Sequence, residues 1–189
     1  DHTGSNAYFT EVKGSTIFAH DNVRKRLVNK KEHTHSELPV VTYQQGITFH
    51  FNGDTINVMH MPAGHTDSDS VVWFEKANVL HPGDLFFEGR FPYIDLDGGG
   101  TVTGYITNVT KLISMLKEDT KIIPGHGSLA TKSDYQKALD MLVDTAAIVK
   151  NMRAKGISVE DAVKQGLGEK YKAWAWNFIT EEKWIHTLY

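Results

Sequence analysis

The distribution of apolar residues in the first half of the chain predicts β-strands. Across residues 46–59 apolar and polar positions alternate, and Asn52-Gly53 interrupts the alternation with a dipeptide that favours two-residue hairpin turns. We therefore predict a β-hairpin. Two further runs, 71–74 and 78–80, are almost continuously apolar, which is typical of strands covered on both faces. A shorter run at 16–20 predicts another buried strand.

The second half of the chain predicts helices. Apolar residues recur at helical spacing across 106–116 and 134–155, and Gly156 follows the second segment as a typical helix stop. A short strand is expected between them, at 120–123. Four apolar side chains of the second helix are expected to face the core: Leu139, Leu142, Val143 and Ile148. Capping residues predict shorter helices near Ser5, Asp21 and Ser158.

Residues 86–102 form a predicted loop that is rich in glycine and aromatic residues. Loops of this length are uncommon in compact domains and often form the walls of active sites. Tyr93 and Phe91 are therefore candidate substrate contacts. The aromatic residues of the C-terminal segment, 174–189, are interpreted as packing residues.

Length and composition favour a single mixed α/β domain over residues 1–189. The chain has 189 residues, 40% of them hydrophobic, which is enough for one buried core. Its formal net charge of −3 provides neither the basic surface typical of nucleic-acid binding nor a polybasic membrane patch. No apolar stretch is long enough to span a bilayer. We expect a small-molecule substrate, and neither nucleic acid nor a membrane as a partner.

Four short motifs carry the candidate chemistry. They are Asp1-His2-Thr3-Gly4, Gly64-His65-Thr66-Asp67-Ser68-Asp69, Pro82-Gly83-Asp84 and Pro124-Gly125-His126-Gly127. The three later motifs each follow a strand-like segment, where a turn can direct a side chain into a shared cleft. With no cysteine in the chain, a metal ion here must be held by imidazole and carboxylate groups. This donor set suits hydrolytic zinc.

In this order, the motifs resemble those of the metallo-β-lactamase-fold hydrolase superfamily, which includes glyoxalase II-like and lactonase-like members. Segments 63–69, 80–87 and 122–127 look like one bacterial branch, often exported. The resemblance implies an αββα sandwich, of which this chain holds the C-terminal portion with the first sheet incomplete. The H-x-H of the family's H-x-H-x-D-H motif would precede Asp1, in an N-terminal segment or a second chain that completes the fold. A periplasmic or secreted location is implied, with the cytoplasm left open.

The resemblance also implies a role for each motif residue. Asp1, His2 and His126 would bind one zinc ion, His65 would bind the other, and Asp84 would bridge the two. Up to two zinc ions are thus expected. The implied catalytic residues are Asp84, through its bridging position, and Asp1, which would orient the nucleophile.

Three neighbours of His65 are candidates for fixing the ligands in place: Thr66, Asp67 and Asp69. The implied activity is zinc-dependent hydrolysis of a cyclic amide, lactone or thioester by a metal-activated water. One alternative is a non-catalytic or truncated module of the same fold with an incomplete metal site. Another is a di-iron, oxygen-reducing relative, whose distinguishing Glu would precede Asp1.

Overall fold

A computed structural model describes residues 2–189 of the chain. The described residues form eight strands, six α-helices and two short 3-10 helices. In chain order the elements are α1 (Asn6–Lys13), β1 (Phe18–His20), α2 (Asp21–Asn29), η1 (His35–Glu37), β2 (Val41–Tyr43), β3 (Gly46–Phe51), β4 (Asp54–Met61), β5 (Asp69–Phe74), β6 (Val79–Phe87), α3 (Val102–Met115), β7 (Lys121–His126), β8 (Ala130–Thr131), α4 (Lys132–Ala154), α5 (Val159–Gln165), η2 (Glu169–Trp174) and α6 (Glu181–Leu188).

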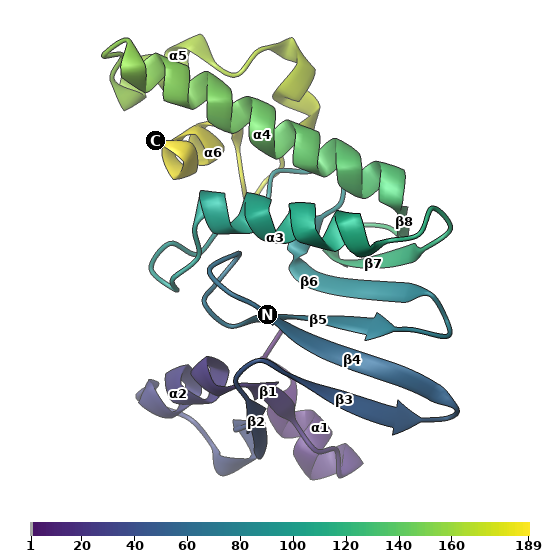
Figure 1. Ribbon diagram of the computed structural model, residues 1–189. Helices are drawn as coiled ribbons and strands as arrows, with labels where there is room; N and C mark the ends of the chain where they lie inside the picture. The colour runs from purple at the N-terminus through teal and green to yellow at the C-terminus, as the bar shows by residue number, and fades with distance from the viewer. Residues whose placement is uncertain (1) are drawn as a thin grey trace.

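Six of the strands form one sheet in the order β3-β4-β5-β6-β7-β8, and β1 pairs with β2 in a separate two-stranded sheet. Neighbours in the larger sheet run antiparallel except for β6 and β7, which are parallel. Helices α3 to α6 gather beside the β6–β8 end, whereas α1, α2 and the small sheet lie at the β3–β5 end (Figure 1). The predicted mixed α/β fold is confirmed.

The predicted hairpin is also confirmed. Strands β3 and β4 pair with Ile47 opposite Val58, and the turn residues Asn52 and Gly53 have φ angles of 51° and 71°. Two successive positive φ angles match the right-handed twist of the strands, and Asn-Gly adopts them at low cost. The local sequence therefore accounts for the turn and for the alternation of this hairpin.

The core lies between the sheet and helices α3 and α4. Every second residue at the start of β7 is buried, and the helices contribute an apolar stripe to the same interior. Fully buried residues of this core include Leu80 and Ile122 of the sheet, Val109 and Leu112 of α3, and Leu142 of α4. The pocket between β6 and the two helices, lined by Tyr105, Tyr135 and Leu142, has a volume of only about 10 Å³, which is too small for a ligand.

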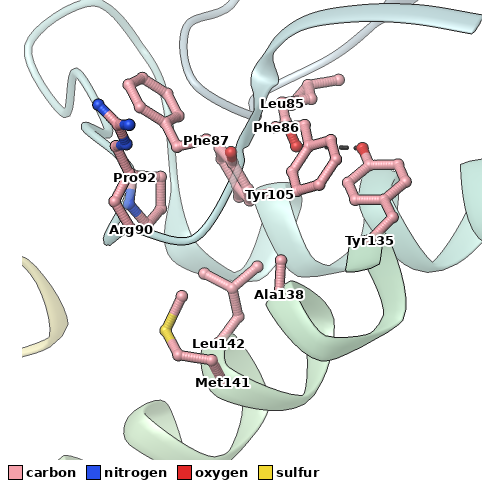
Figure 2. Close-up of a pocket in the computed structure, with 10 residues that line it drawn as sticks. All are labelled: Leu85, Phe86, Phe87, Arg90, Pro92, Tyr105, Tyr135, Ala138, Met141 and Leu142. Atoms are coloured by element: carbon pink, nitrogen blue, oxygen red, sulfur yellow. Dashed lines mark hydrogen bonds between the residues drawn. The ribbon is translucent and has the colours of Figure 1, made fainter. Parts of the chain in front are cut away.

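Two buried tyrosines attach the helices to β6. The Tyr105 hydroxyl of α3 donates to the Asp84 carbonyl at 2.9 Å, and the Tyr135 hydroxyl of α4 donates to the Leu85 carbonyl at 3.0 Å. Figure 2 shows the second bond among the apolar side chains around it. Burial raises the pKa of both tyrosines well above its usual value, so both remain protonated donors. These two hydrogen bonds anchor β6 in the region where its pairing register with β7 shifts.

Side-chain caps explain where the helices begin. The hydroxyls of Thr101, Thr131 and Ser158 accept hydrogen bonds from the first turns of α3, α4 and α5, as the capping residues of a helix do. Thr131 and Asp134 form a reciprocal capping box. Within residues 2–189, no helix has both the length and the apolar character required to cross a bilayer.

Several sequence-based expectations need correction. The strand expected at 16–20 is only the three residues of β1, and its Phe18 is 38% exposed. The loop expected from residue 86 begins later, because β6 continues to Phe87. Val143 does not face the core, since 46% of its surface is exposed. Strands β2 and β8 are too short to give a recognisable pattern.

The Tyr135 hydrogen bond can be tested by Tyr135→Phe. This substitution leaves the Leu85 carbonyl without its buried donor, and we expect the free energy of unfolding to fall by about 1–3 kcal/mol. Chemical denaturation measures the change. Tyr8→Phe serves as the control, because Tyr8 is 51% exposed, and its effect should stay below about 0.5 kcal/mol.

Candidate metal centre

Three of the five predicted ligands, His2, His65 and His126, converge on the carboxylate of a fourth, Asp84. His2 Nε2 lies 2.9 Å and His126 Nε2 3.4 Å from Asp84 Oδ1, whereas His65 Nε2 lies 3.4 Å from Oδ2. The two oxygens of one carboxylate thus face different imidazoles. His2, Asp84 and His126 together could hold one metal ion, with their ligand atoms all within 4.8 Å of one another. Asp1, the fifth predicted ligand, lies outside the described residues.

The sheet topology explains this convergence. Parallel neighbours β6 and β7 carry Asp84 and His126 toward the same edge, and Phe87 of β6 pairs in register with His126. His65 follows β4 in the next loop of the same sheet, and His2 lies just before α1. Asp84 was expected at the end of a strand, but it lies inside β6, at a register irregularity. Such irregularities redirect side chains.

Two glycines make room for the Asp84 carboxylate. Gly83 has a φ of 56°, in the left-handed region that glycine enters at no steric cost, and so permits the distortion immediately before Asp84. Gly125 lies on the neighbouring strand β7, where a Cβ atom would collide with Asp84 Oδ1. A larger residue at Gly125 would therefore displace the carboxylate from the histidines.

The imidazole of His65 is oriented by a backbone carbonyl. His65 Nδ1 lies 2.8 Å from the carbonyl oxygen of Tyr93, and in the tautomer that donates this bond Nε2 carries no proton. That nitrogen is the one directed at Asp84 Oδ2. Metal-ligating histidines usually have such a partner on the second ring nitrogen. Sequence reasoning missed this contact, since a backbone carbonyl leaves no trace in residue identity.

Asp69 holds the loop that carries His65. Its Oδ2 accepts from the His65 backbone N–H at 2.6 Å, and its Oδ1 accepts from the Thr66 N–H at 3.0 Å and the Thr66 hydroxyl at 2.7 Å. Burial raises the pKa of Asp69, and these hydrogen bonds and the nearby His65 oppose the rise without cancelling it. Asp69 and Thr66 therefore fix the backbone of His65, not its ring.

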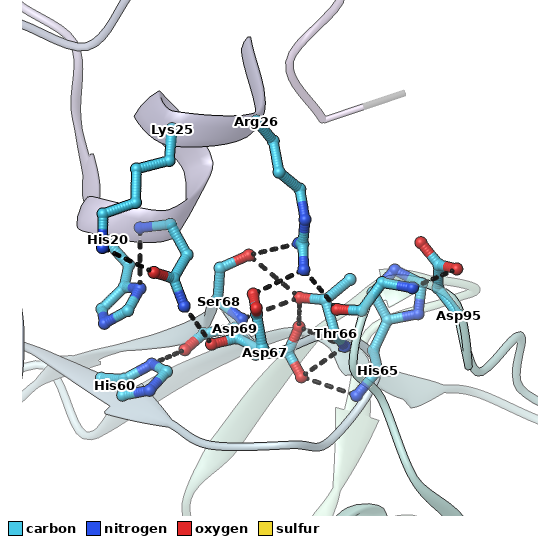
Figure 3. Close-up of polar contacts among 12 residues, drawn as sticks. His20, Lys25, Arg26, His60, His65, Thr66, Asp67, Ser68, Asp69 and Asp95 are labelled. Carbon is cyan, nitrogen blue, oxygen red and sulfur yellow. Dashed lines mark hydrogen bonds and ion pairs between the residues drawn. The ribbon is translucent and has the colours of Figure 1, made fainter. Parts of the chain in front are cut away.

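Asp67 connects the same loop to α2. The Arg26 guanidinium lies 2.7 Å from Asp67 Oδ1 and also donates to the Ser68 hydroxyl at 3.3 Å and to the Gly98 carbonyl. Figure 3 shows Arg26 extending from α2 into this group. Arg26 thus joins the 64–69 loop to the 88–101 loop. Asp67 therefore acts on His65 only indirectly, through the position of this loop.

Histidines around Asp84 set its charge. Burial raises the pKa of this carboxyl, but contact with His2 and the neighbouring charges of His65, His2 and His126 outweigh burial and hold the pKa below its ordinary value. The contact with Asp84 raises the pKa of His2, against the opposing effect of burial. Asp84 is therefore an ionised carboxylate at neutral pH.

The donor set and its spacing fit zinc. Two atoms bound tetrahedrally at about 2.0–2.1 Å from zinc lie about 3.4 Å apart. The His65 and His126 nitrogens each lie 3.4 Å from an Asp84 oxygen. Asp84 Oδ1 is buried and accepts no hydrogen bond of regular geometry, even though His2 is close to it. A buried carboxylate oxygen in this situation is well suited to bind a cation.

A cavity of about 890 Å³ opens over these residues, with His2, His65, Asp84 and His126 in its lining. Tyr93, one of the two predicted substrate contacts, lies on its wall. The second predicted substrate contact, Phe91, does not line the cavity. The prediction that Phe91 contacts substrate is therefore wrong.

Phe91 is fully buried and stacks on Trp184 at 5.6 Å between ring centroids, because its side chain points into the core. Two aromatic residues assigned to packing, Trp176 and Phe178, line the cavity instead. No local pattern distinguishes the two cases, since an aromatic side chain has the same sequence signature in a core and on a cavity wall.

Comparison with known proteins decides the family. A sequence model of the metallo-beta-lactamase superfamily matches residues 1–126, a span that contains all five predicted ligands. The chain belongs to the metallo-beta-lactamase superfamily. The metallo-beta-lactamase IND-1 of Chryseobacterium indologenes is 25% identical over 75% of this chain, and metallo-beta-lactamase type 2 of Bacillus sp. (strain 170) is 23% identical over 70% of it.

Solved structures of the superfamily share the fold. A metallo-beta-lactamase from Pontibacter korlensis aligns with a TM-score of 0.60 at 17% identity, over 71% of this chain and 61% of that one. The metallo-beta-lactamase IND-7 aligns with a TM-score of 0.59 at 25% identity, over 72% of this chain and 61% of the other. The chain spans only 57% of IND-1 and 51% of the Bacillus enzyme.

The part played by Asp69 can be tested with Asp69→Asn. The substitution places an amide nitrogen against backbone donors of the His65 loop, so we expect the free energy of unfolding to fall by about 1–3 kcal/mol. We also expect zinc affinity, measured against a competing chelator, to fall about 10- to 100-fold. Asp97→Asn, an exposed change in a neighbouring loop, should alter neither quantity. An Asp69→Asn protein with unchanged affinity and stability would contradict this role.

Proposed function

We propose that this protein is a zinc-dependent hydrolase that acts on a carbonyl group in a small molecule, namely a cyclic amide, a lactone or a thioester. One observation carries the proposal. The Asp84 carboxylate directs Oδ1 at His2 and His126, and Oδ2 at His65. This is the arrangement expected of a carboxylate that bridges two metal positions. Membership of a superfamily that includes metallo-beta-lactamases supports it.

The residues divide between two metal positions. His2 and His126, with Oδ1 of Asp84, would hold one zinc ion together with Asp1, and His65 with Oδ2 would hold the other. The chemistry that bound zinc supplies is the activation of water and the polarisation of a substrate carbonyl. Asp84 contributes a negative charge that neutralises part of the metal charge.

The surrounding groups prepare the site before substrate arrives. The Tyr93 carbonyl fixes the ring orientation of His65, and Asp69 fixes the loop behind it. Tyr105 holds the carbonyl of Asp84 and thereby the strand from which the carboxylate projects. Because hydrogen bonds already hold these groups in place, the ligands need little rearrangement to bind metal.

A second candidate function is a non-catalytic module with an incomplete metal site. The observation in its favour is the Oδ2 side of Asp84, where the described part of the chain offers one histidine, His65. Catalytic zinc usually has three protein ligands. Metal content and activity distinguish the two functions.

The test uses the full chain with zinc added, and a panel that contains a β-lactam, a lactone and a thioester. We expect tightly bound zinc, hydrolysis of at least one member, and loss of activity on addition of a chelator. His126→Ala should lower kcat/KM at least about 100-fold, because it removes a proposed metal ligand. His50→Ala, an exposed change on β3, should have no effect.

Full activity of the His126→Ala protein would refute the hydrolase proposal. A chain that binds one zinc ion or none and hydrolyses no member of the panel would instead support the non-catalytic module.

A further inference from the structure

Four aromatic side chains form a continuous wall on one side of the cavity. We call this group, Phe87, Tyr93, Trp176 and Phe178, the aromatic wall. Ring centroids are 6.2 Å apart between Phe87 and Trp176, 5.5 Å between Trp176 and Phe178, and 5.5 Å between Phe178 and Tyr93. All four residues line the cavity.

The aromatic wall begins at the candidate metal ligands. The Tyr93 ring lies 5.6 Å from the His65 ring in an edge-on arrangement, and Phe87 stacks on His126 with 4.7 Å between centroids. The wall therefore directly borders the histidines of the candidate metal centre.

Hydrogen bonds hold the wall in place. Trp176 Nε1 donates to the Phe91 carbonyl at 2.9 Å, and the Phe91 N–H donates to the Trp174 carbonyl at 2.8 Å. The Trp176 N–H donates to the Ile179 carbonyl at 3.0 Å. The Arg90 guanidinium lies 5.2 Å from the centre of the Trp176 ring and covers part of it. A wall fixed in this way loses little freedom on binding a ligand.

The wall retains apolar surface that the fold does not bury. Phe178 is 50% exposed and Tyr93 is 38% exposed, although the Trp184 ring nearby is completely buried. Scattered exposed aromatics are common, but these line one concave surface beside the candidate metal centre. Concave apolar surfaces with a few convergent polar groups are typical of small-molecule sites.

We propose that the substrate carries an aromatic or similarly flat apolar substituent close to its scissile carbonyl, and that Trp176 and Phe178 bind this substituent. The inference rests on the proposed hydrolase function and adds the chemical class of its substrate. Aromatic groups stack against aromatic side chains in offset or edge-on geometry, which a wall of linked rings can offer along its length.

Matched substrates test the proposal in the zinc-loaded full chain. Phenylacetyl and acetyl forms of the same thioester and the same lactone differ only in the ring. We expect kcat/KM to be about tenfold higher for the phenylacetyl form. Phe178→Ala and Trp176→Ala should each remove most of this preference, mainly by raising KM for the phenylacetyl form.

Controls separate recognition from folding. Phe51→Ala changes an aromatic residue that is 64% exposed at the end of β3, away from the cavity, and should leave the preference intact. Trp176→Phe keeps a flat ring without the indole N–H and should retain more of the preference than Trp176→Ala. A phenylacetyl preference that is absent, or equal in the wild type and in the Phe178→Ala protein, overturns the inference while leaving the hydrolase function standing.

A binding measurement does not depend on activity. Phenylacetate, titrated into the metal-free protein, should change tryptophan fluorescence, whereas acetate should not. The phenylacetate dissociation constant should rise about tenfold in Phe178→Ala. Equal affinity in the wild type and the variant refutes the aromatic site, whatever the activity. Weakened binding in a protein that neither holds zinc nor hydrolyses the panel supports the aromatic site and refutes the hydrolase function.

Discussion

The burial of one carboxylate, that of Asp84, imposes the strongest constraint on this structure. A buried charge costs several kcal/mol unless opposite charges or hydrogen-bond donors surround it. Here the compensation comes from His2, His65 and His126, which reach Asp84 from three separate segments. The surrounding backbone adapts to the carboxylate, with Gly125 leaving space beside it. The convergence of three histidines and the irregular pairing of β6 with β7 are two consequences of the same requirement.

The scaffold and the site walls have separate tasks. The six-stranded sheet and helices α3 and α4 form a close-packed base that fixes the ligand-bearing segments. The walls come from elsewhere: the 64–69 loop, held by Arg26 of α2, and the C-terminal segment that carries Trp176 and Phe178. Because one fold hosts many activities, the proposed substrate choice would depend on the residues of the aromatic wall, of which only Phe87 belongs to the sheet. The aromatic wall is therefore the more informative feature of this particular chain.

Much of the fold follows from short-range pattern. The hairpin of β3 and β4 was predictable because alternation and the Asn-Gly turn act within a few residues. Helices α3 and α4 were predictable for the same reason, from apolar spacing and, for α4, from the Gly156 stop, whereas their capping residues Thr101 and Thr131 were not predicted. The length of β6 was not, since Pro82 and Gly83 resemble a turn, and only pairing with β7 and the tyrosine hydrogen bonds keep the strand extended beyond them.

The sequence by itself determined the type of chemistry: imidazole and carboxylate donors beside glycines, in an order typical of one superfamily, with no thiolate among them. Tertiary structure alone decided which Asp84 oxygen faces which histidine, and that a Tyr93 carbonyl orients His65. It also placed Phe91 in the core and Phe178 on the cavity. The physical reason is distance along the chain. Residue types and spacings act locally, whereas burial and orientation depend on contacts such as the hydrogen bond from Trp176 to Phe91, which joins residues 85 positions apart.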